Sequence, residues 1–281
     1  MVFICDKSYD SDEYDNYFEK YPFELSDFQK YAIESIVLGN HILITAHTGS
    51  GKTLPAEFAI EYFTGKLKKV IYTSPIKALS NQKFYEFTKK FPNVNIGIMT
   101  GDIKFNPDAD VLIMTTEILQ NNLYKKLQNI ETKSSLQFDI NIDRDLECVI
   151  FDEVHYINDK DRGKVWEETI MMLPKHVQMV MLSATIDNPE KFAKWCENRY
   201  SDDLKKVWLA SSLERCVPLY HYSYVNVNNL LFKKIKDEEE EKDIKKKIGK
   251  PLLLKDSSGF KDDTIIEVNK IKKKLTLHNT Y

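Results

Sequence analysis

Short apolar runs alternate with longer, mixed segments along most of the chain. Six runs of five to seven residues are rich in Val, Ile, Leu and Met, and we predict strands at 41–45, 69–74, 94–99, 111–115, 148–152 and 177–183. The other segments have the length and mixed polarity of helices, which we predict at 26–38, 53–64, 77–90, 116–128, 162–173 and 188–198. Apolar strands separated by helices favour an α/β fold in which a mostly parallel sheet carries helices on both faces.

The segments that follow the predicted strands carry most of the residues suited to ligand binding. In a parallel sheet the carboxyl ends of the strands lie along one edge, and ligands bind at that edge. The segments that follow predicted strands in this way are AHTGSGKT, SPIK, TTE, DEVH and SAT. We therefore expect all five to gather at one edge of the sheet.

The two ends of the chain differ in character from its centre. Residues 1–21 are acidic and aromatic without a period, and we interpret them as an N-terminal extension. Residues 22–210 form the expected main domain, in which the polar segment 129–145 is predicted to be a surface loop. Residues 211–281 combine a strand-like stretch with a charge block at 233–250, which is expected to be solvated or disordered.

Length, charge and cysteine content narrow the class of protein. The 281 residues suffice for one large domain or two small ones, and no apolar run approaches the roughly 18 residues of a membrane span. The N-terminus lacks the layout of a signal peptide, and the four cysteines lack metal-ligand spacing, so we expect a soluble intracellular protein with no membrane partner. A net charge of −3 supplies no field that would draw the whole chain onto nucleic acid. Only four of the 40 basic residues are arginine, which indicates an AT-rich genome.

The segment at 46–53, AHTGSGKT, has the composition of a phosphate-binding loop. Glycine lets the backbone turn sharply and approach a ligand, and successive backbone N–H groups before a helix cradle phosphate. The pattern is close to G-x-x-x-x-G-K-[ST], with Ala46 in place of the first glycine. The predicted phosphate-binding residues are Ala46, His47, Thr48, Gly49, Ser50, Gly51, Lys52 and Thr53.

Two adjacent carboxylates, Asp152 and Glu153, stand at the exit of a predicted strand. Successive side chains of a strand point in opposite directions, so the two acids can serve different targets. One can hold a hydrated Mg²⁺ and the other can activate an attacking water. Mg²⁺ takes few protein ligands, which suits Asp152 together with Thr53. The alternative is a solvated acidic turn. In the later segment LSAT, the hydroxyls of Ser183 and Thr185 can hydrogen-bond these acids.

Taken in order, several segments resemble the first RecA-like domain of a superfamily 2 DExH helicase. They are AHTGSGKT, TSPIKALSNQK, TGDIKFNPDADVLIMTTEIL, FDEVHYINDKDRGKVWEE and LSATIDNPEKFAKW. The resemblance covers about residues 21–224 and is most specific to the superkiller-type RNA helicases that feed the RNA exosome. It implies a RecA-like P-loop NTPase domain that uses ATP and Mg²⁺ and acts on RNA. The chain departs from that branch at Gly49 and Ser50, where Ser-Ala is usual, and in a longer loop after residue 126.

The resemblance also implies individual roles. Lys52 would reach the β- and γ-phosphates, Thr53 and Asp152 would hold Mg²⁺, and Glu153 would be the general base. His155 would link this acidic motif to the serine and threonine of LSAT.

For the base, the resemblance implies that Phe23 stacks on adenine and that Gln29 reads its edge. Gln29 has a second interpretation, because Ser26 and Gln29 are spaced as a helix capping box. Arg162 and Trp166 are expected to serve packing and contact between domains.

The nucleic-acid strand would be bound by small or hydroxyl-bearing residues at strand ends, which can bond phosphates without reading bases. The predicted residues are Ser74, Pro75, Lys77, Thr100, Gly101, Thr115, Thr116 and Glu117. The alternative is that these residues only cap helices and shape turns.

Three functions remain open at this stage: an ATP-dependent, 3′-to-5′ RNA helicase, a DNA helicase of the same superfamily, and a nucleotide-gated binding module without unwinding activity. After LSAT nothing resembles the arginine motif by which a second RecA-like domain completes the ATP site, and the last arginine is Arg215. We therefore expect the N-terminal part of a longer protein, monomeric by itself, in which residues 211–281 are a linker and the start of the second domain with a charged insertion.

Overall fold

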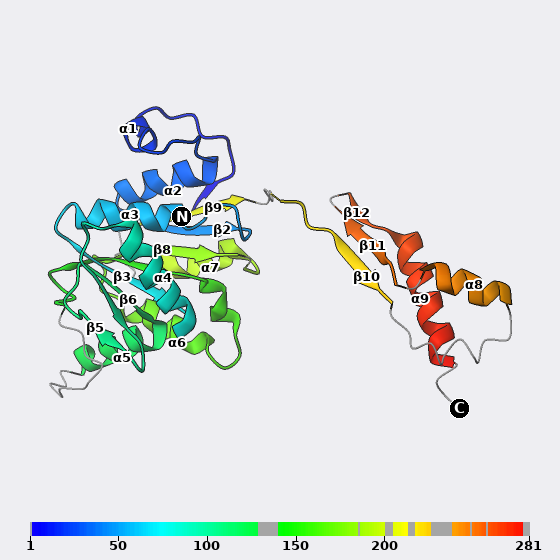
Figure 1. Ribbon diagram of the computed structural model, residues 1–281. Helices are drawn as coiled ribbons and strands as arrows, with labels where there is room; N and C mark the ends of the chain where they lie inside the picture. Colours follow the sequence, from blue (N-terminus) through cyan, green and yellow to red (C-terminus); the bar gives the residue numbers. More distant parts are fainter. Residues whose placement is uncertain are drawn as a thin grey trace. The chain divides into compact units, whose positions relative to one another are not determined.

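The computed structural model describes residues 2–128, 140–184, 186–199, 205–212, 217–225, 238–247, 249–256 and 258–277. The chain divides into two compact units, residues 1–214 (unit 1) and 215–281 (unit 2) (Figure 1). The division falls a few residues after the boundary at 210 that the change in composition predicts.

Within the described residues, unit 1 is built on a nine-stranded sheet with the order β1-β9-β2-β8-β7-β3-β6-β4-β5. Its strands are β1 (Phe3–Cys5), β2 (His41–Ala46), β3 (Lys69–Ser74), β4 (Ile96–Met99), β5 (Lys104–Phe105), β6 (Val111–Thr115), β7 (Leu146–Phe151), β8 (Gln178–Ser183) and β9 (Val207–Ser212). All neighbouring pairs are parallel except β4 with β5. The predicted α/β fold is therefore confirmed, and the six predicted strands match β2, β3, β4, β6, β7 and β8.

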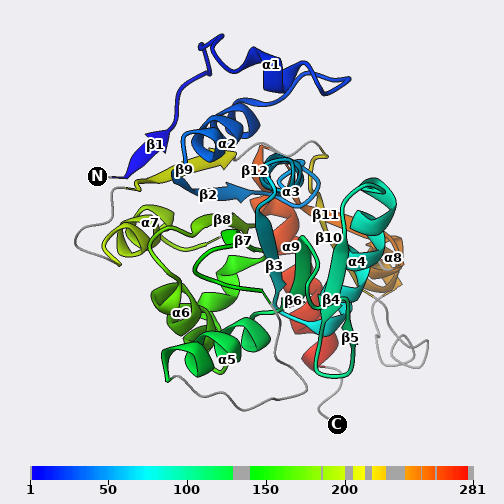
Figure 2. The same cartoon turned by 90° about the vertical axis from the view of Figure 1, so that its left-hand side faces the viewer.

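Helices cover both faces of this sheet. They are α1 (Asp15–Phe18), α2 (Asp27–Val37), α3 (Leu54–Thr64), α4 (Lys77–Lys90), α5 (Thr116–Leu127), the 3₁₀ helix η1 (Val154–Asn158), α6 (Gly163–Met172) and α7 (Pro189–Glu197). Alternate strand residues point to opposite faces. Ile42 and Ile44 pack with α2, α3 and α4, whereas Leu43 belongs to the core formed with α5, α6 and α7 (Figure 2).

The N-terminal segment is part of unit 1 rather than an appendage to it. β1 extends the sheet by pairing in parallel with β9, and the ring centroids of Phe3 and Trp208 lie 4.3 Å apart. Tyr17 packs edge-on against Phe58 of α3, with centroids 5.6 Å apart. The N-terminal segment therefore packs onto unit 1, with Tyr14 buried and Tyr17 and Phe18 partly buried against the core. Neither β1 nor β9 was among the predicted strands, although residues 2–5 and 207–210 are short apolar runs.

The prediction of a surface loop over residues 129–145 is wrong for the last part of that segment, which is partly buried. Residues 129–139 lie outside the described residues. Ile140 and Ile142 are buried and belong to the core on the side of α5 and α6. These two apolar residues therefore anchor the segment that leads into β7.

The described residues of unit 2 form a small antiparallel sheet, β10-β11-β12, and two helices. The elements are β10 (His221–Tyr224), α8 (Glu238–Lys247), β11 (Pro251–Asp256), β12 (Gly259–Phe260) and α9 (Asp262–Leu277). The charge block expected to be solvated or disordered thus includes a helix, in which Glu241 pairs with Lys245 one turn later and Ile244 is buried. No helix in the described parts of either unit is long and apolar enough to cross a membrane.

Candidate functional site

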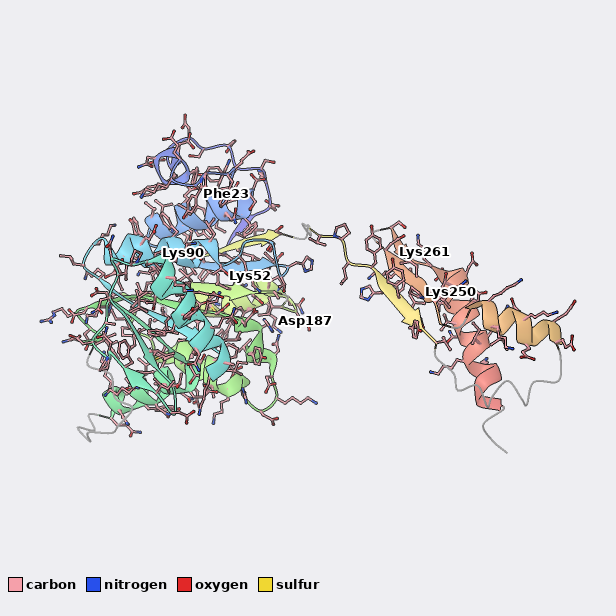
Figure 3. The ribbon with its side chains drawn as sticks, in the orientation of Figure 1. Phe23, Lys52, Lys90, Asp187, Lys250 and Lys261 are labelled. Atoms are coloured by element: carbon pink, nitrogen blue, oxygen red, sulfur yellow. The ribbon has the colours of Figure 1, made fainter. Side chains whose placement is uncertain are left out.

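The loop after β2 has the backbone conformation that its glycines predict. Gly49 and Gly51 have φ angles of +85° and +83°, in the left-handed region that side chains disfavour. Ser50 closes the turn by donating from its backbone N and its Oγ to the carbonyl of His47 at 3.2 and 2.7 Å. Lys52 stands at the end of this loop, directly before α3 (Figure 3).

Gln29 connects α2 to this loop. Its Oε1 accepts from the backbone N of Ser26 at 3.0 Å, which completes the predicted capping box. Its Nε2 donates to the carbonyl of Gly51 at 3.1 Å. The same amide thus performs the cap and contacts the phosphate loop. Phe23 precedes α2, and its ring is 56% exposed, beside Tyr21 at a centroid distance of 5.9 Å (Figure 3).

Lys52 and Glu153 form an ion pair between the loop after β2 and the end of β7. Lys52 Nζ lies 3.3 Å from both carboxylate oxygens of Glu153, and the two side chains are 10% and 27% exposed. Glu153 adopts φ 53° and ψ 46°, which is uncommon for a residue other than glycine. This left-handed residue lies after the end of β7 at Phe151 and directly before the start of η1 at Val154. Backbone strain of this kind clusters at functional sites, where the surrounding structure maintains it.

The neighbouring residue, Asp152, is buried, and each oxygen of its carboxylate accepts a hydrogen bond. Its Oδ1 accepts from the backbone N of Glu153 at 3.0 Å, and its Oδ2 accepts from the hydroxyl of Tyr72 at 2.6 Å. Burial raises the pKa of Asp152, while the hydrogen bond from Tyr72 acts in the opposite direction. A buried carboxylate whose charged form is disfavoured gains from a cation beside it.

The predicted coupling residues are only partly described. His155 Nδ1 lies 3.3 Å from Glu153 Oε2, but their geometry is not that of a hydrogen bond. Ser183 is the last residue of β8, fully buried, and its Oγ has no hydrogen-bond partner within the described residues. Thr185 lies outside those residues. The coupling role therefore stays a prediction.

A cavity of about 530 Å³ opens at the ends of β3 and β6. It is lined by Pro75, Ile76, Lys77, Ala78, Gly101, Thr115, Glu117, Ile118 and Arg162. Five of the eight residues predicted to bind nucleic acid are therefore brought together here. The other three are buried: Ser74, Thr100 and Thr116. Ser74 contributes to the structure of the wall, because its Oγ lies 2.7 Å from Ser80 Oγ and donates to the carbonyl of Ile76 at 3.1 Å.

The positive charge in this cavity comes from two side chains. Lys77 Nζ is already paired with Asp102 Oδ2 at 2.7 Å. Arg162 donates from Nη1 to the carbonyl of Pro75 at 3.4 Å, and its backbone N bonds Asp159 Oδ1 at 2.9 Å. Arg162, which was expected to serve packing and contact between domains, thus also lines this cavity. Arg162 lies in FDEVHYINDKDRGKVWEE, one of the segments that carry the resemblance to superkiller-type helicases. That position is the one sequence signal that points to a role in this cavity. Trp166, by contrast, is fully buried, as expected for a packing residue.

Comparison with known proteins identifies the family to which this chain belongs. Residues 26–192, more than half of the chain, match the profile of the DEAD/DEAH box helicases. The chain therefore belongs to the DEAD/DEAH box helicase family.

Among curated relatives, the chain is 49% identical over 199 residues to "Antiviral helicase SKI2" of Saccharomyces cerevisiae, covering 71% of this chain and 14% of that protein. It is 45% identical over 205 residues to "Superkiller complex protein 2" of Homo sapiens, covering 73% and 15%. It is 42% identical over 206 residues to "Exosome RNA helicase MTR4" of Mus musculus, covering 73% and 18%. The resemblance to superkiller-type helicases is confirmed. The chain spans less than a fifth of the length of these relatives.

Among solved structures, the chain is similar to a "DUF1998 helicase MrfA bound to DNA", with a TM-score of 0.54 and 16% identity over 73% of this chain and 30% of that one. At this identity the likeness concerns the fold alone. It supports the RecA-like helicase architecture expected for unit 1.

Proposed function

We propose that this chain is the ATP-binding and ATP-hydrolysing part of a 3′-to-5′ RNA helicase. The observation that carries the proposal is the contact of Lys52 with Glu153 beside the buried Asp152, at the edge where the phosphate loop leaves β2. The names of the relatives, which include RNA helicases at 42–44% identity, support RNA as the substrate.

The residues present fit ATP with Mg²⁺. Both glycines hold the loop in a left-handed turn, and the space beside Gly49 is open, since an added Cβ there would meet nothing within 4 Å. The hydroxyl of Thr53 and the carboxylate of Asp152 are hard oxygen ligands. When bound, Mg²⁺ would neutralise phosphate charge and help to orient the reacting groups. Burial also disfavours the charge of Asp152, and a cation beside it would compensate.

We infer that the Lys52–Glu153 pair opens when nucleotide binds. Among the described residues the ammonium of Lys52 pairs with the carboxylate of Glu153. Phosphate oxygens would replace that carboxylate when nucleotide binds. The freed carboxylate can then accept a proton from the attacking water, which is the role of a general base. Glu153 is less buried than Lys52, so it is the side chain with access to water. Phe23 and Gln29 would hold the adenine.

Single-stranded RNA would cross the cavity at the ends of β3 and β6. Threonine hydroxyls and backbone amides there suit phosphate contacts, which position a strand without reading its sequence. Arg162 joins the predicted residues in this proposal, because it lines the same cavity and has no acidic partner among the described contacts. A DNA strand is the alternative substrate. The 2′-hydroxyl contacts that distinguish RNA belong to no motif identified in this chain.

The remaining parts of the proposal concern the longer protein. A second RecA-like domain would supply the arginine that completes the ATP site, and unit 2 would be the start of that domain with its charged insertion. The small share of the relatives that this chain covers supports this reading. We expect residues 1–281 to be monomeric and to act inside the cell.

The test compares Lys52→Ala with Glu153→Gln in the 281-residue chain. Binding of a fluorescent ADP and slow release of phosphate from ATP are measured with protein in excess. Glu153→Gln should bind nucleotide at least as well as the wild type but lose about 10²–10⁴-fold in hydrolysis, because it keeps the shape and removes the base. Lys52→Ala should instead weaken binding.

Matched controls come from the other end of β7, where Lys68 and Glu147 form an ion pair, also at 3.3 Å. Lys68→Ala and Glu147→Gln should change neither measurement. Equal loss of nucleotide affinity in Lys52→Ala and Glu153→Gln would contradict the assigned roles.

A further inference from the structure

We propose that Tyr72 is a positioning residue that holds the carboxylate of Asp152 in the orientation needed for Mg²⁺. The inference rests on the function proposed above. It adds a residue that lies on β3, outside the phosphate loop, the acidic motif and the residues predicted to bind nucleic acid.

Tyr72 reaches Asp152 across two neighbouring strands. β3 and β7 are paired in parallel, and the backbone N of Asp152 donates to the carbonyl of Thr73 at 2.9 Å. This pairing places the start of the acidic motif beside Tyr72, whose hydroxyl donates to Asp152 Oδ2 at 2.6 Å. Tyr72 is fully buried, so water does not compete for this bond.

The carboxylate of Asp152 is held from both sides. The hydroxyl of Tyr72 bonds one oxygen, and the backbone N of Glu153 bonds the other at 3.0 Å. Each carboxylate oxygen can accept more than one hydrogen bond, so both retain capacity for a water in a metal's shell. The ring of Tyr72 packs edge-on against Phe87 of α4, with centroids 5.2 Å apart, which limits its movement.

A buried hydroxyl needs a partner, and a backbone carbonyl would satisfy that need. Here the partner is instead the carboxylate predicted to hold the metal. Burial, and next the Asp152 carboxylate, keep the pKa of Tyr72 well above its ordinary value, so the hydroxyl remains a donor. Partners that orient a metal-binding side chain in this way typically change metal affinity or activity by about 10–100-fold when they are removed.

The experiment compares the wild type with Tyr72→Phe, which removes the hydroxyl and keeps the ring. The control is Thr73→Val, because Thr73 Oγ1 is also buried and donates from β3 to β7, to the carbonyl of Ile150 at 3.1 Å. The contact of Thr73 with Asp152 is made by its backbone carbonyl, which the substitution keeps. Binding of a fluorescent, non-hydrolysable ATP analogue to the 281-residue chain is measured while Mg²⁺ is titrated, and also in EDTA. Thermal unfolding without nucleotide is followed by tryptophan fluorescence.

We expect Tyr72→Phe to raise the Mg²⁺ concentration for half-maximal binding about 10–100-fold and to leave affinity in EDTA close to that of the wild type. Thr73→Val should lower thermal stability but keep the wild-type Mg²⁺ dependence. The inference is overturned if Tyr72→Phe keeps that dependence, if it loses affinity equally with and without Mg²⁺, or if Thr73→Val shifts the dependence as much. A wild type that binds the analogue without any response to Mg²⁺ would overturn the proposed metal site itself.

Discussion

Gly51→Ala should destabilise unit 1 more than Gly49→Ala, although the two glycines have nearly the same backbone conformation. Their φ angles are +83° and +85°. A Cβ on Gly49 would meet nothing within 4 Å, whereas a Cβ on Gly51 would lie 2.6 Å from Nε2 of Gln29. Comparing the two alanine substitutions therefore separates two contributions to the free energy of unfolding: the strain of a left-handed alanine, and the displacement of the Gln29 amide.

The magnitudes follow from these contacts. Each alanine carries a conformational cost of about 1–2 kcal/mol in the left-handed region. At Gly51 the Gln29 amide must also move, which weakens its bonds to the Gly51 carbonyl and the Ser26 backbone N, at 3.1 and 3.0 Å. Each such bond contributes about 0.5–1.5 kcal/mol net. The excess cost of Gly51→Ala over Gly49→Ala is then about 1–3 kcal/mol in the free energy of unfolding.

Urea denaturation followed by tryptophan fluorescence measures this difference. The three tryptophans are Trp166, Trp195 and Trp208, all in unit 1, so the signal reports that unit alone. A double-mutant cycle adds Gln29→Ala, in whose background Gly51→Ala should cost no more than Gly49→Ala. Equal costs of the two glycine substitutions in the wild-type background, or an unchanged excess without Gln29, would refute the reasoning.

Three further outcomes are expected. ATP should displace a fluorescent ADP better than GTP does if Phe23 and Gln29 hold adenine, and equal displacement would leave Gln29 as a helix cap only. Single-stranded RNA should bind weakly, without sequence preference and with strong salt dependence; Arg162→Ala should lower the salt slope by about 0.7 in filter or anisotropy titrations. Lys77→Ala should lower that slope less, because Asp102 already pairs with Lys77, and the reverse order would contradict the charge assignment. The 281-residue chain should hydrolyse ATP slowly and leave a duplex with a 3′ overhang intact in a gel assay, because an arginine finger worth about 10³–10⁵ in rate would come from the second domain. Robust unwinding by this chain would exclude that division of roles.

The sequence by itself was enough to predict the central strands of unit 1 and the segments expected to carry its catalytic residues. Runs such as 41–45 and 111–115 have uninterrupted apolar centres, Ile42–Ile44 and Val111–Met114, because strands covered on both faces bury successive side chains on opposite sides. Motif spacing then predicted catalytic roles for Lys52, Asp152 and Glu153, since a glycine loop before a helix and acids after a strand are local signals. Five of the eight predicted nucleic-acid residues share one cavity because parallel strands end at a common edge.

Only the tertiary structure decided which partners these residues take. The bond of Tyr72 to Asp152 joins residues 80 positions apart, and the contact of Gln29 with Gly51 joins two helix starts. Neither follows from a period or a spacing, because each depends on which strands and helices become neighbours. The places of β1 and β9 in the sheet are also set by the tertiary structure, since β9 pairs with β2 and β1 then pairs with β9. Arg162, directly before α6, likewise lines its cavity because α6 packs against α5, at whose start the cavity residues Thr115 and Glu117 lie.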